Sequence, residues 1–250
     1  TTMDLGAQSE TQTTDANVAT ITPIITTNLD GKISEVIDAL GVSGGETIVD
    51  KLDQVAADIK ASGGEASAFA LDLASPKAIK SALDALKATT HTLDIFLANA
   101  ALGGVRVPLI EYPPDGWMQL FQVNVHANLQ LLAGLHPLLT RSDAARVVII
   151  STGVSRFPRA NTGAYACSKA ALEAMAGIYA LEIAGTPIKI NMVNPGATRT
   201  TMRAEAYPKE DPMTLKVPEA VMPLLMELAS SPARGRASGS PRTSGWRRQP

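Results

Sequence analysis

Short apolar runs alternate with stretches of helical hydrophobic spacing from residue 66 onward, and this alternation constrains the fold more than any other feature. The strands we expect are residues 66–72, 93–98, 146–151 and 187–193. The helices we expect are residues 76–88, 114–138, 164–183 and 217–229. Strands that alternate with helices form βαβ units, whose right-handed crossovers make a parallel sheet. The sequence therefore predicts an α/β fold with a doubly wound parallel sheet.

The alternation breaks down towards the N-terminus. Residues 1–29 are rich in Thr, Ser, Asn and Gln and predict a flexible arm. Residues 46–61 have helical spacing and end at Gly63-Gly64. We therefore expect a single domain over residues 30–231, with an irregular N-terminal edge. Residues 232–250 combine arginines with Gly, Ser and Pro and contain no acidic residue. They predict a basic, disordered tail, although a shifted reading frame would produce the same composition.

The composition argues against several classes of protein. A hydrophobic content of 45% in 250 residues is typical of a globular domain, and a net charge of −2 indicates neither a nucleic-acid nor a membrane partner. Residues 116–140 carry no charge, but their Gln, Asn and His side chains argue against a membrane span. The three histidines lack the spacing and acidic companions of a metal site. A single cysteine and no recognisable secretory signal lead us to expect a cytoplasmic location.

Tyr165 and Lys169 are the strongest candidates for chemistry. A spacing of four residues puts them on one face of the helix expected at 164–183. A desolvated phenol beside an ammonium can exchange a proton closer to neutral pH, because the positive charge favours the phenolate. Two hydroxyls, Ser151 and Thr152, follow the strand expected at 146–151 and are candidates to bind the same substrate oxygen.

These residues resemble the short-chain dehydrogenase/reductase family, whose signature is Tyr-x-x-x-Lys with an upstream Ser. Four further segments match the family in order and position, over roughly Leu52 to Ser230. They are Asp72 after the first expected strand, the turn 97–101 after the second, Asn124 in the helix 114–138, and Pro195-Gly196-Ala197-Thr198 after the fourth strand. The resemblance implies a Rossmann-like fold and an oxidoreductase that interconverts a carbonyl and an alcohol with NAD or NADP.

The resemblance also implies a role for each catalytic candidate. Tyr165 is expected to be the general acid/base, and Lys169 to lower its pKa and bind the nicotinamide ribose. Thr152 stands where the family usually has Ser and is expected to hold the substrate oxygen, with Ser151 as the weaker candidate. Asn124 is expected to bend its helix and to hold a water that relays protons through Lys169.

A second set of residues is implied to bind the cofactor. Asp72 is expected to contact the adenine, and Asn99 with Ala100 to line the adenosine side. Pro195, Gly196 and Thr198 are expected at the nicotinamide end, together with Tyr165 and Lys169. The residue that distinguishes NAD from NADP ends a second strand that we cannot recognise in this chain, so the choice between them stays open.

One family feature has no counterpart, the Gly-rich loop that binds the cofactor pyrophosphate. The only glycine cluster in that part of the chain is 41–45, and it follows a polar helix-like stretch rather than a buried strand. The cluster therefore favours a helix stop over a phosphate site, and we expect weakened cofactor binding. Three interpretations remain. The first is an active NAD(P)-dependent enzyme with a small-molecule carbonyl or alcohol substrate, and the second is a catalytically silent or cofactor-impaired scaffold or oligomer partner. The third is a truncated or frame-altered product that folds only partly.

The uncharged run of residues 116–140 also predicts self-association. One face of so apolar a helix is poorly suited to water. We therefore expect a homo-oligomer, a dimer or a tetramer, and the family resemblance implies that the helices 114–138 and 164–183 form its interface.

Overall fold

The computed structural model of the chain describes residues 48–61, 63–67 and 71–230. The arm expected at 1–29, the glycine cluster 41–45 and the tail expected at 232–250 lie outside the described residues. The strand expected at 66–72 is described only at 66–67 and 71–72, and none of these residues is in a strand.

A parallel sheet forms the centre of the described molecule. Its strands are β1 (Ile95–Ala98), β2 (Arg146–Ile150) and β3 (Lys189–Val193), in the order β1-β2-β3. Arg146 at the start of β2 lies opposite both Ile95 and Lys189, so the three strands begin in register. The parallel sheet expected from the alternation is therefore confirmed.

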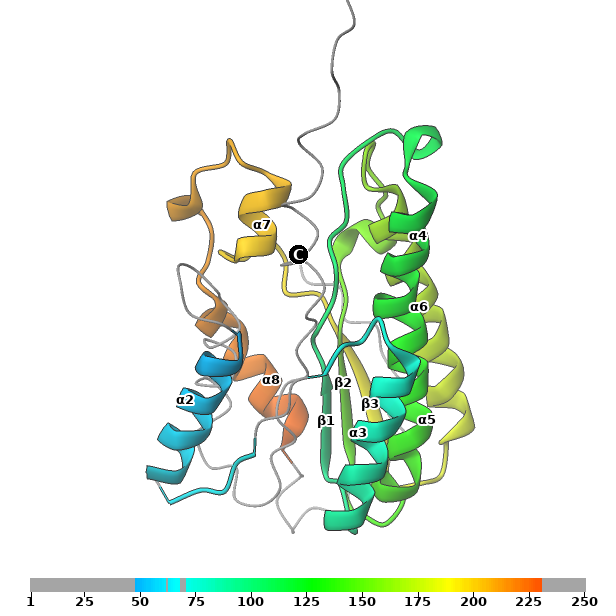
Figure 1. Cartoon of the computed structure of the whole chain (residues 1–250), viewed down its shortest axis with the longest axis vertical. Helices are drawn as coiled ribbons and strands as arrows, with labels where there is room; N and C mark the ends of the chain where they lie inside the picture. The colour runs from blue at the N-terminus through cyan, green and yellow to red at the C-terminus, as the bar shows by residue number, and fades with distance from the viewer. Residues whose placement is uncertain (1–47, 62, 68–70, 231–250) are drawn as a thin grey trace, which may run out of the picture.

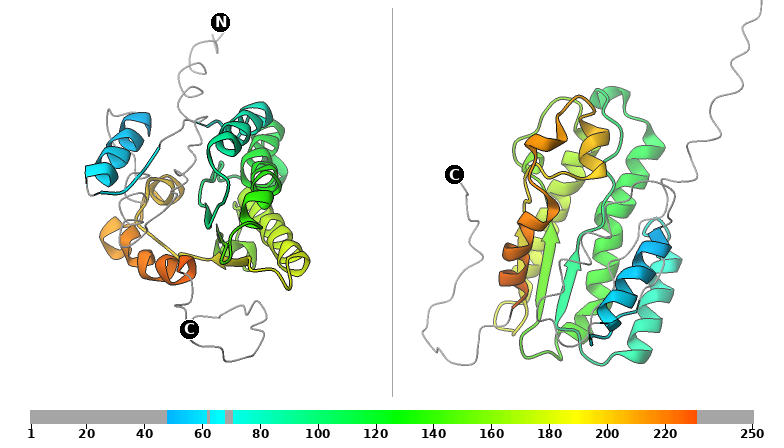
Figure 2. Two further views of the ribbon diagram at one scale, coloured as in Figure 1. Left: turned by 90° about the horizontal axis from the view of Figure 1, so that it is seen from below. Right: turned by 90° about the vertical axis from the view of Figure 1, so that its left-hand side faces the viewer.

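Helices lie on both sides of this sheet (Figure 1). One layer contains α3 (Pro76–Thr89), α4 (Pro114–Phe121), α5 (Ala127–Leu139) and α6 (Gly163–Glu182). On the other side lie α2 (Ile48–Ala61), α7 (Thr201–Ala206) and α8 (Met222–Ala229). Figure 2 shows the same two layers from below and from one side. This is the α/β, Rossmann-like, single-domain architecture that the sequence predicts.

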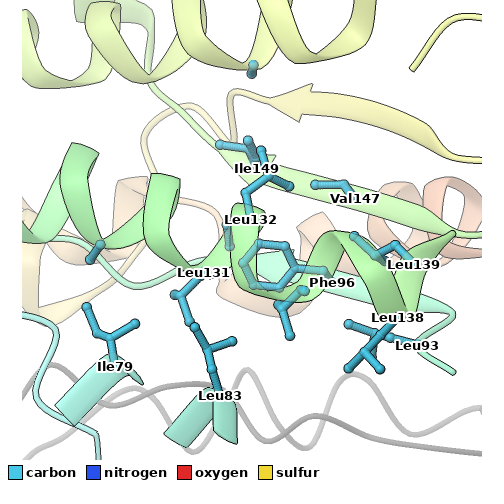
Figure 3. Close-up of a cluster of buried hydrophobic side chains, with 14 of the residues drawn as sticks. Ile79, Leu83, Leu93, Phe96, Leu131, Leu132, Leu138, Leu139, Val147 and Ile149 are labelled. Carbon is cyan, nitrogen blue, oxygen red and sulfur yellow. The ribbon is translucent and has the colours of Figure 1, made fainter. Parts of the chain in front are cut away.

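Alternation along β2 explains why both faces are covered. Val147 and Ile149 point into the larger hydrophobic core, while Val148 between them joins Val193, Met222 and Leu225 on the α8 side. Successive side chains of a strand point to opposite faces, so an unbroken apolar strand needs a helical layer on each. Figure 3 shows the larger core, where α3 and α5 meet the sheet. Its labelled residues are Ile79, Leu83, Leu93, Phe96, Leu131, Leu132, Leu138, Leu139, Val147 and Ile149.

Local signals set several element boundaries. The Ser75 hydroxyl accepts a hydrogen bond from the Ala78 N–H at 3.2 Å, and Pro76 occupies the first turn, so α3 begins with a side-chain cap.

Two expected helices are interrupted. The 114–138 helix is divided by a π-helical turn, η2 (Gln122–His126), and the 217–229 helix begins as the 3₁₀ turn η5 (Pro218–Val221). The remaining 3₁₀ turns are η1 (Leu109–Glu111), η3 (Gly153–Ser155) and η4 (Pro212–Thr214). Among the described helices, none has the length and apolar character needed to cross a membrane.

Candidate active site

The candidate residues gather where the parallel strands end. Asn99 and Ala100 follow β1, Ser151 and Thr152 follow β2, and the turn 194–198 follows β3. The carboxyl ends of parallel strands lie at one edge of a sheet, which is where open α/β sheets bind their ligands. The helix α6 brings Tyr165 and Lys169 to the same edge, as the contacts below show.

Thr152 is the hydroxyl that meets Tyr165. The two side chains are hydrogen-bonded, and both are half-buried. The Ser155 hydroxyl donates to the Thr152 carbonyl oxygen at 2.6 Å and fixes the turn η3 behind it. Ser151 is directed elsewhere, because its hydroxyl donates to Oε1 of the buried Glu173 at 2.5 Å. Of the two candidate hydroxyls, the structure places Thr152 beside the phenol.

Burial raises the pKa of Tyr165 above its ordinary value of 10.0. The hydrogen bond from Thr152 and the positive charge of Arg106 oppose this shift. From the sequence, Lys169 was expected to supply this opposing charge, whereas the cation that acts on the Tyr165 pKa here is Arg106. The Lys169 ammonium donates to the Ile150 carbonyl oxygen at 2.9 Å, so its hydrogen bond is made at the end of β2 rather than with the phenol.

Lys169 carries its charge inside the protein. Its side chain is almost completely buried, and desolvation lowers its pKa from 10.5 to about 8, with the Glu173 carboxylate acting in the opposite direction. Glu173 lies one helical turn further along α6 and also accepts hydrogen bonds from Ser155, at 2.7 Å, and from Arg156, at 3.2 Å. The carboxylate therefore ties the segment around Thr152 to the helix that carries Tyr165.

Asn124 joins three parts of the site through a fully buried amide. Its Oδ1 accepts from the Leu102 N–H at 2.8 Å, and its Nδ2 donates to the Leu102 carbonyl oxygen at 2.9 Å and to the Ser168 hydroxyl at 3.0 Å. Its helix was expected to bend, and it contains the π-helical turn Gln122–His126, in which the amide of Asn128 donates to the Asn124 carbonyl oxygen at 3.0 Å.

The residues expected at the nicotinamide end form a tight turn. The Asn194 side chain accepts from the Gly196 N–H at 3.0 Å, and the nearly buried Thr198 hydroxyl donates within the turn, to Pro195 and Gly196 carbonyl oxygens. Gly196 has a φ of +69°, which favours glycine there.

Of the residues expected on the adenosine side, Asp72 accepts from the Ala74 N–H at 2.8 Å and so fixes the chain before α3. Asn99 and Ala100 are half-buried at the end of β1. Within the described residues, no group of three or more His, Cys, Asp or Glu side chains is placed to hold a metal ion.

Comparison with known proteins decides the family. The model of the protein family described as short chain dehydrogenase matches residues 34–211. The chain belongs to the short chain dehydrogenase family. Among its relatives in this family of oxidoreductases is the uncharacterised oxidoreductase YciK of Escherichia coli K12. The two are 40% identical over 188 residues, and the match covers 74% of each chain.

Solved short chain dehydrogenases have the same fold. One from Shigella flexneri, complexed with NADP, gives a TM-score of 0.69 at 39% identity, covering 73% of this chain and 77% of the other. Another from Escherichia coli CFT073, complexed with NADPH, gives a TM-score of 0.69 at 40% identity, with the same coverage.

Two residues of this short chain dehydrogenase escaped the sequence reasoning. Glu173 has a readable signal, since an acid four residues after a lysine on a helix faces that lysine. Arg106 lies in the irregular segment between β1 and η1, where no periodicity indicates which way a side chain points. Only the folded chain shows its influence on Tyr165.

Proposed function

We propose that this protein interconverts a small-molecule carbonyl and its alcohol with NADP(H) or NAD(H), and that Tyr165 is the general acid/base. The observation that carries the proposal is the hydrogen-bonded pair of Thr152 and Tyr165 at the carboxyl end of β2, with the buried cation of Lys169 one helical turn away. The NADP and NADPH complexes of relatives at 39% and 40% identity favour the phosphorylated cofactor.

The donor set at this edge of the sheet fits a dinucleotide. An ammonium has three N–H groups. Among the described residues, Lys169 has one such hydrogen bond, to Ile150, which leaves donors for ribose hydroxyls. The nicotinamide supplies or accepts the hydride when it is bound. The turn 194–198, Asn99 and Ala100 border the same edge and are the residues that we assign to its two ends.

The chain's own residues handle the substrate oxygen and the proton. Thr152 donates a hydrogen bond to the carbonyl oxygen as negative charge develops on it, and Tyr165 delivers the proton that completes the alcohol. The raised pKa of Tyr165 keeps the phenol protonated at neutral pH. A protonated phenol suits the reductive direction, in which it must donate a proton.

Removal of the Tyr165 hydroxyl tests this proposal. Tyr165→Phe should lower turnover of any accepted carbonyl by at least about 10²-fold, the usual effect of a positioned acid/base. A matched control is Tyr179→Phe, because Tyr179 is also a half-buried phenol of α6 but bonds to His136 at 2.8 Å. Steady-state NADPH oxidation measures both variants. Equal turnover in Tyr165→Phe and in the unaltered protein would place the proton transfer elsewhere.

Calorimetric titration with NADPH and NADH tests the cofactor. Each lost hydrogen bond to a charged group costs roughly 1.5–3 kcal/mol, so a pyrophosphate without two of its usual partners would bind about 10²- to 10⁴-fold more weakly. Binding of both cofactors with a Kd well above about 1 µM is the expected result. A tighter complex would show that another segment supplies a phosphate site.

A further inference from the structure

The segment that follows β1 packs against both α7 and the start of α6. At one end, a Cβ added to Gly103 would stand 3.3 Å from Cγ of Met202, so this part of the segment packs closely against α7. At the other end, Leu109 lies against Gly163, because a Cβ there would meet its Cδ1 at 2.7 Å. Gly163 lies two residues before Tyr165. Arg106 therefore lies midway along a segment that connects α7 to the first turn of α6.

Two guanidinium groups stack on the Tyr207 ring, and they differ in whether a carboxylate pairs with them. The central carbon of Arg106 is 4.2 Å from the ring centroid, and that of Arg203 is 3.8 Å from it. Arg203 is neutralised by Glu210, with two contacts of 2.6 Å. For Arg106, the described part of the chain supplies no carboxylate partner. A guanidinium stacked on an aromatic ring keeps its N–H edge free for an oxyanion.

The charge of Arg106 reaches the reacting group. It lowers the pKa of Tyr165 against the effect of burial, so the guanidinium lies within electrostatic range of the phenol oxygen. Arg106 is exposed and has no carboxylate partner among the described residues, so it adds positive charge to the region around the phenol. A substrate with a suitably placed negative charge would balance it.

We propose that Arg106 is a specificity-determining residue that binds an oxyanion group, a carboxylate or a phosphate, of a carbonyl substrate. Guanidinium and oxyanion groups match in a two-point geometry, which Tyr207 helps to preorganise by holding the planar group. The assignment names a substrate class for the site and rests on the proposed oxidoreductase function.

Matched substrate pairs test this assignment. One pair is levulinate and its methyl ester, and a second is dihydroxyacetone phosphate and dihydroxyacetone. In the unaltered protein, kcat/KM should be about 10- to 100-fold higher for an anionic member than for its neutral partner, the effect of one or two charged hydrogen bonds. The pair that shows the preference distinguishes carboxylate from phosphate. Arg106→Gln should abolish the preference through KM, and Arg106→Lys should restore part of it.

Arg141→Gln is the matched control. Arg141 is exposed and donates to the His91 carbonyl oxygen, beyond the C-terminal end of α5 and away from the Tyr165 pair, so the same loss of charge should leave the preference intact. Equal kcat/KM within both pairs, or a preference that survives Arg106→Gln, would overturn the assignment.

Binding separates this assignment from the proposed function. Calorimetry of levulinate and of dihydroxyacetone phosphate needs no turnover. If no pair is turned over, binding of an anion that is lost in Arg106→Gln still supports the site, and turnover of other carbonyls decides the oxidoreductase proposal. If neither anion binds more tightly than its neutral partner, the assignment of Arg106 fails whatever the turnover.

Discussion

Lys169 holds a positive charge almost entirely away from water, and this has a consequence for stability. Its folded-state pKa of about 8 lies below the ordinary value of 10.5. Between these pH values the unfolded chain binds the extra proton and the folded chain does not, so stability rises with pH across that window. Below pH 8 both states are protonated, and the burial cost is present in full.

Lys169→Met should therefore flatten the pH dependence of unfolding. Between about pH 7.5 and pH 10 the unaltered protein should gain up to about 3 kcal/mol from this residue, at 1.36 kcal/mol for each pKa unit. Urea unfolding at fixed protein concentration measures the difference. Lys209→Met, at an exposed position, is the control and should keep the original slope. Parallel curves for Lys169→Met and the unaltered protein would contradict a depressed pKa.

The pair of Tyr165 and Lys169 was predictable because helical spacing alone puts the two residues on one face. The sequence favoured Thr152 over Ser151 as the hydroxyl beside Tyr165 but did not decide between them. It depends on Glu173, whose buried carboxylate takes the Ser151 hydroxyl and leaves Thr152 for the phenol. Arg106 was not predictable, because its position is set by contacts with Tyr207, which is remote in the sequence.

The π-helical turn η2 is the element that links the site to its surroundings. Its Asn124 amide satisfies both the N–H and the carbonyl of Leu102, in the segment between β1 and Arg106. The same amide bonds to Ser168 of α6. The turn thus holds the segment after β1 in a fixed relation to the helix that carries Tyr165 and Lys169.

Asn124→Ala should release that segment. Leu102 is half-buried and would lose partners for both backbone groups, at a cost of about 1–3 kcal/mol for each group that water does not reach. Hydrogen exchange should become faster at the Leu102 amide, and the protein should unfold at lower urea. The comparison variant is Asn128→Ala, which removes the bond to the Asn124 carbonyl inside the turn but leaves the Asn124 side chain in place. Unchanged exchange at Leu102 in Asn124→Ala would show that the amide does not hold the segment.

The sequence predicted the positions of whole helices and strands better than the irregular turns inside the helices. The strand expected at 146–151 is β2 at Arg146–Ile150, and the helix expected at 164–183 is α6 at Gly163–Glu182. The turn η2 was hidden inside one long apolar helix, because hydrophobic periodicity averages over a single wider turn. The signal for an irregular helix was the match of Asn124 to the family's asparagine, and not the hydrophobic periodicity.

Exposed apolar side chains occur on α4, α5 and α6, three of the four helices on one side of the sheet. On α6, Ala174, Ile178 and Leu181 are exposed at spacings of four and three residues, so they form one stripe. Ile178 is 58% exposed and Leu181 78%. On the neighbouring α5, Leu129 is 51% exposed, and Met118 of α4 is 66% exposed. Large exposed apolar patches often mark an interface with another protein.

We expect this surface to bury itself against a second copy of the chain. A charge placed in the α6 stripe would have to be desolvated on association, so Ile178→Glu should shift the protein to monomer. The control is Ala85→Glu, which introduces the same charge at an exposed position of α3, a helix without exposed large apolar side chains. Sedimentation velocity at micromolar concentration should show an oligomer for the unaltered protein and for the control, and a monomer for Ile178→Glu. When the same surface of two subunits pairs about a two-fold axis, a dimer forms, so a dimer is the smallest assembly that would bury this stripe. A monomeric unaltered protein would leave the stripe without this role.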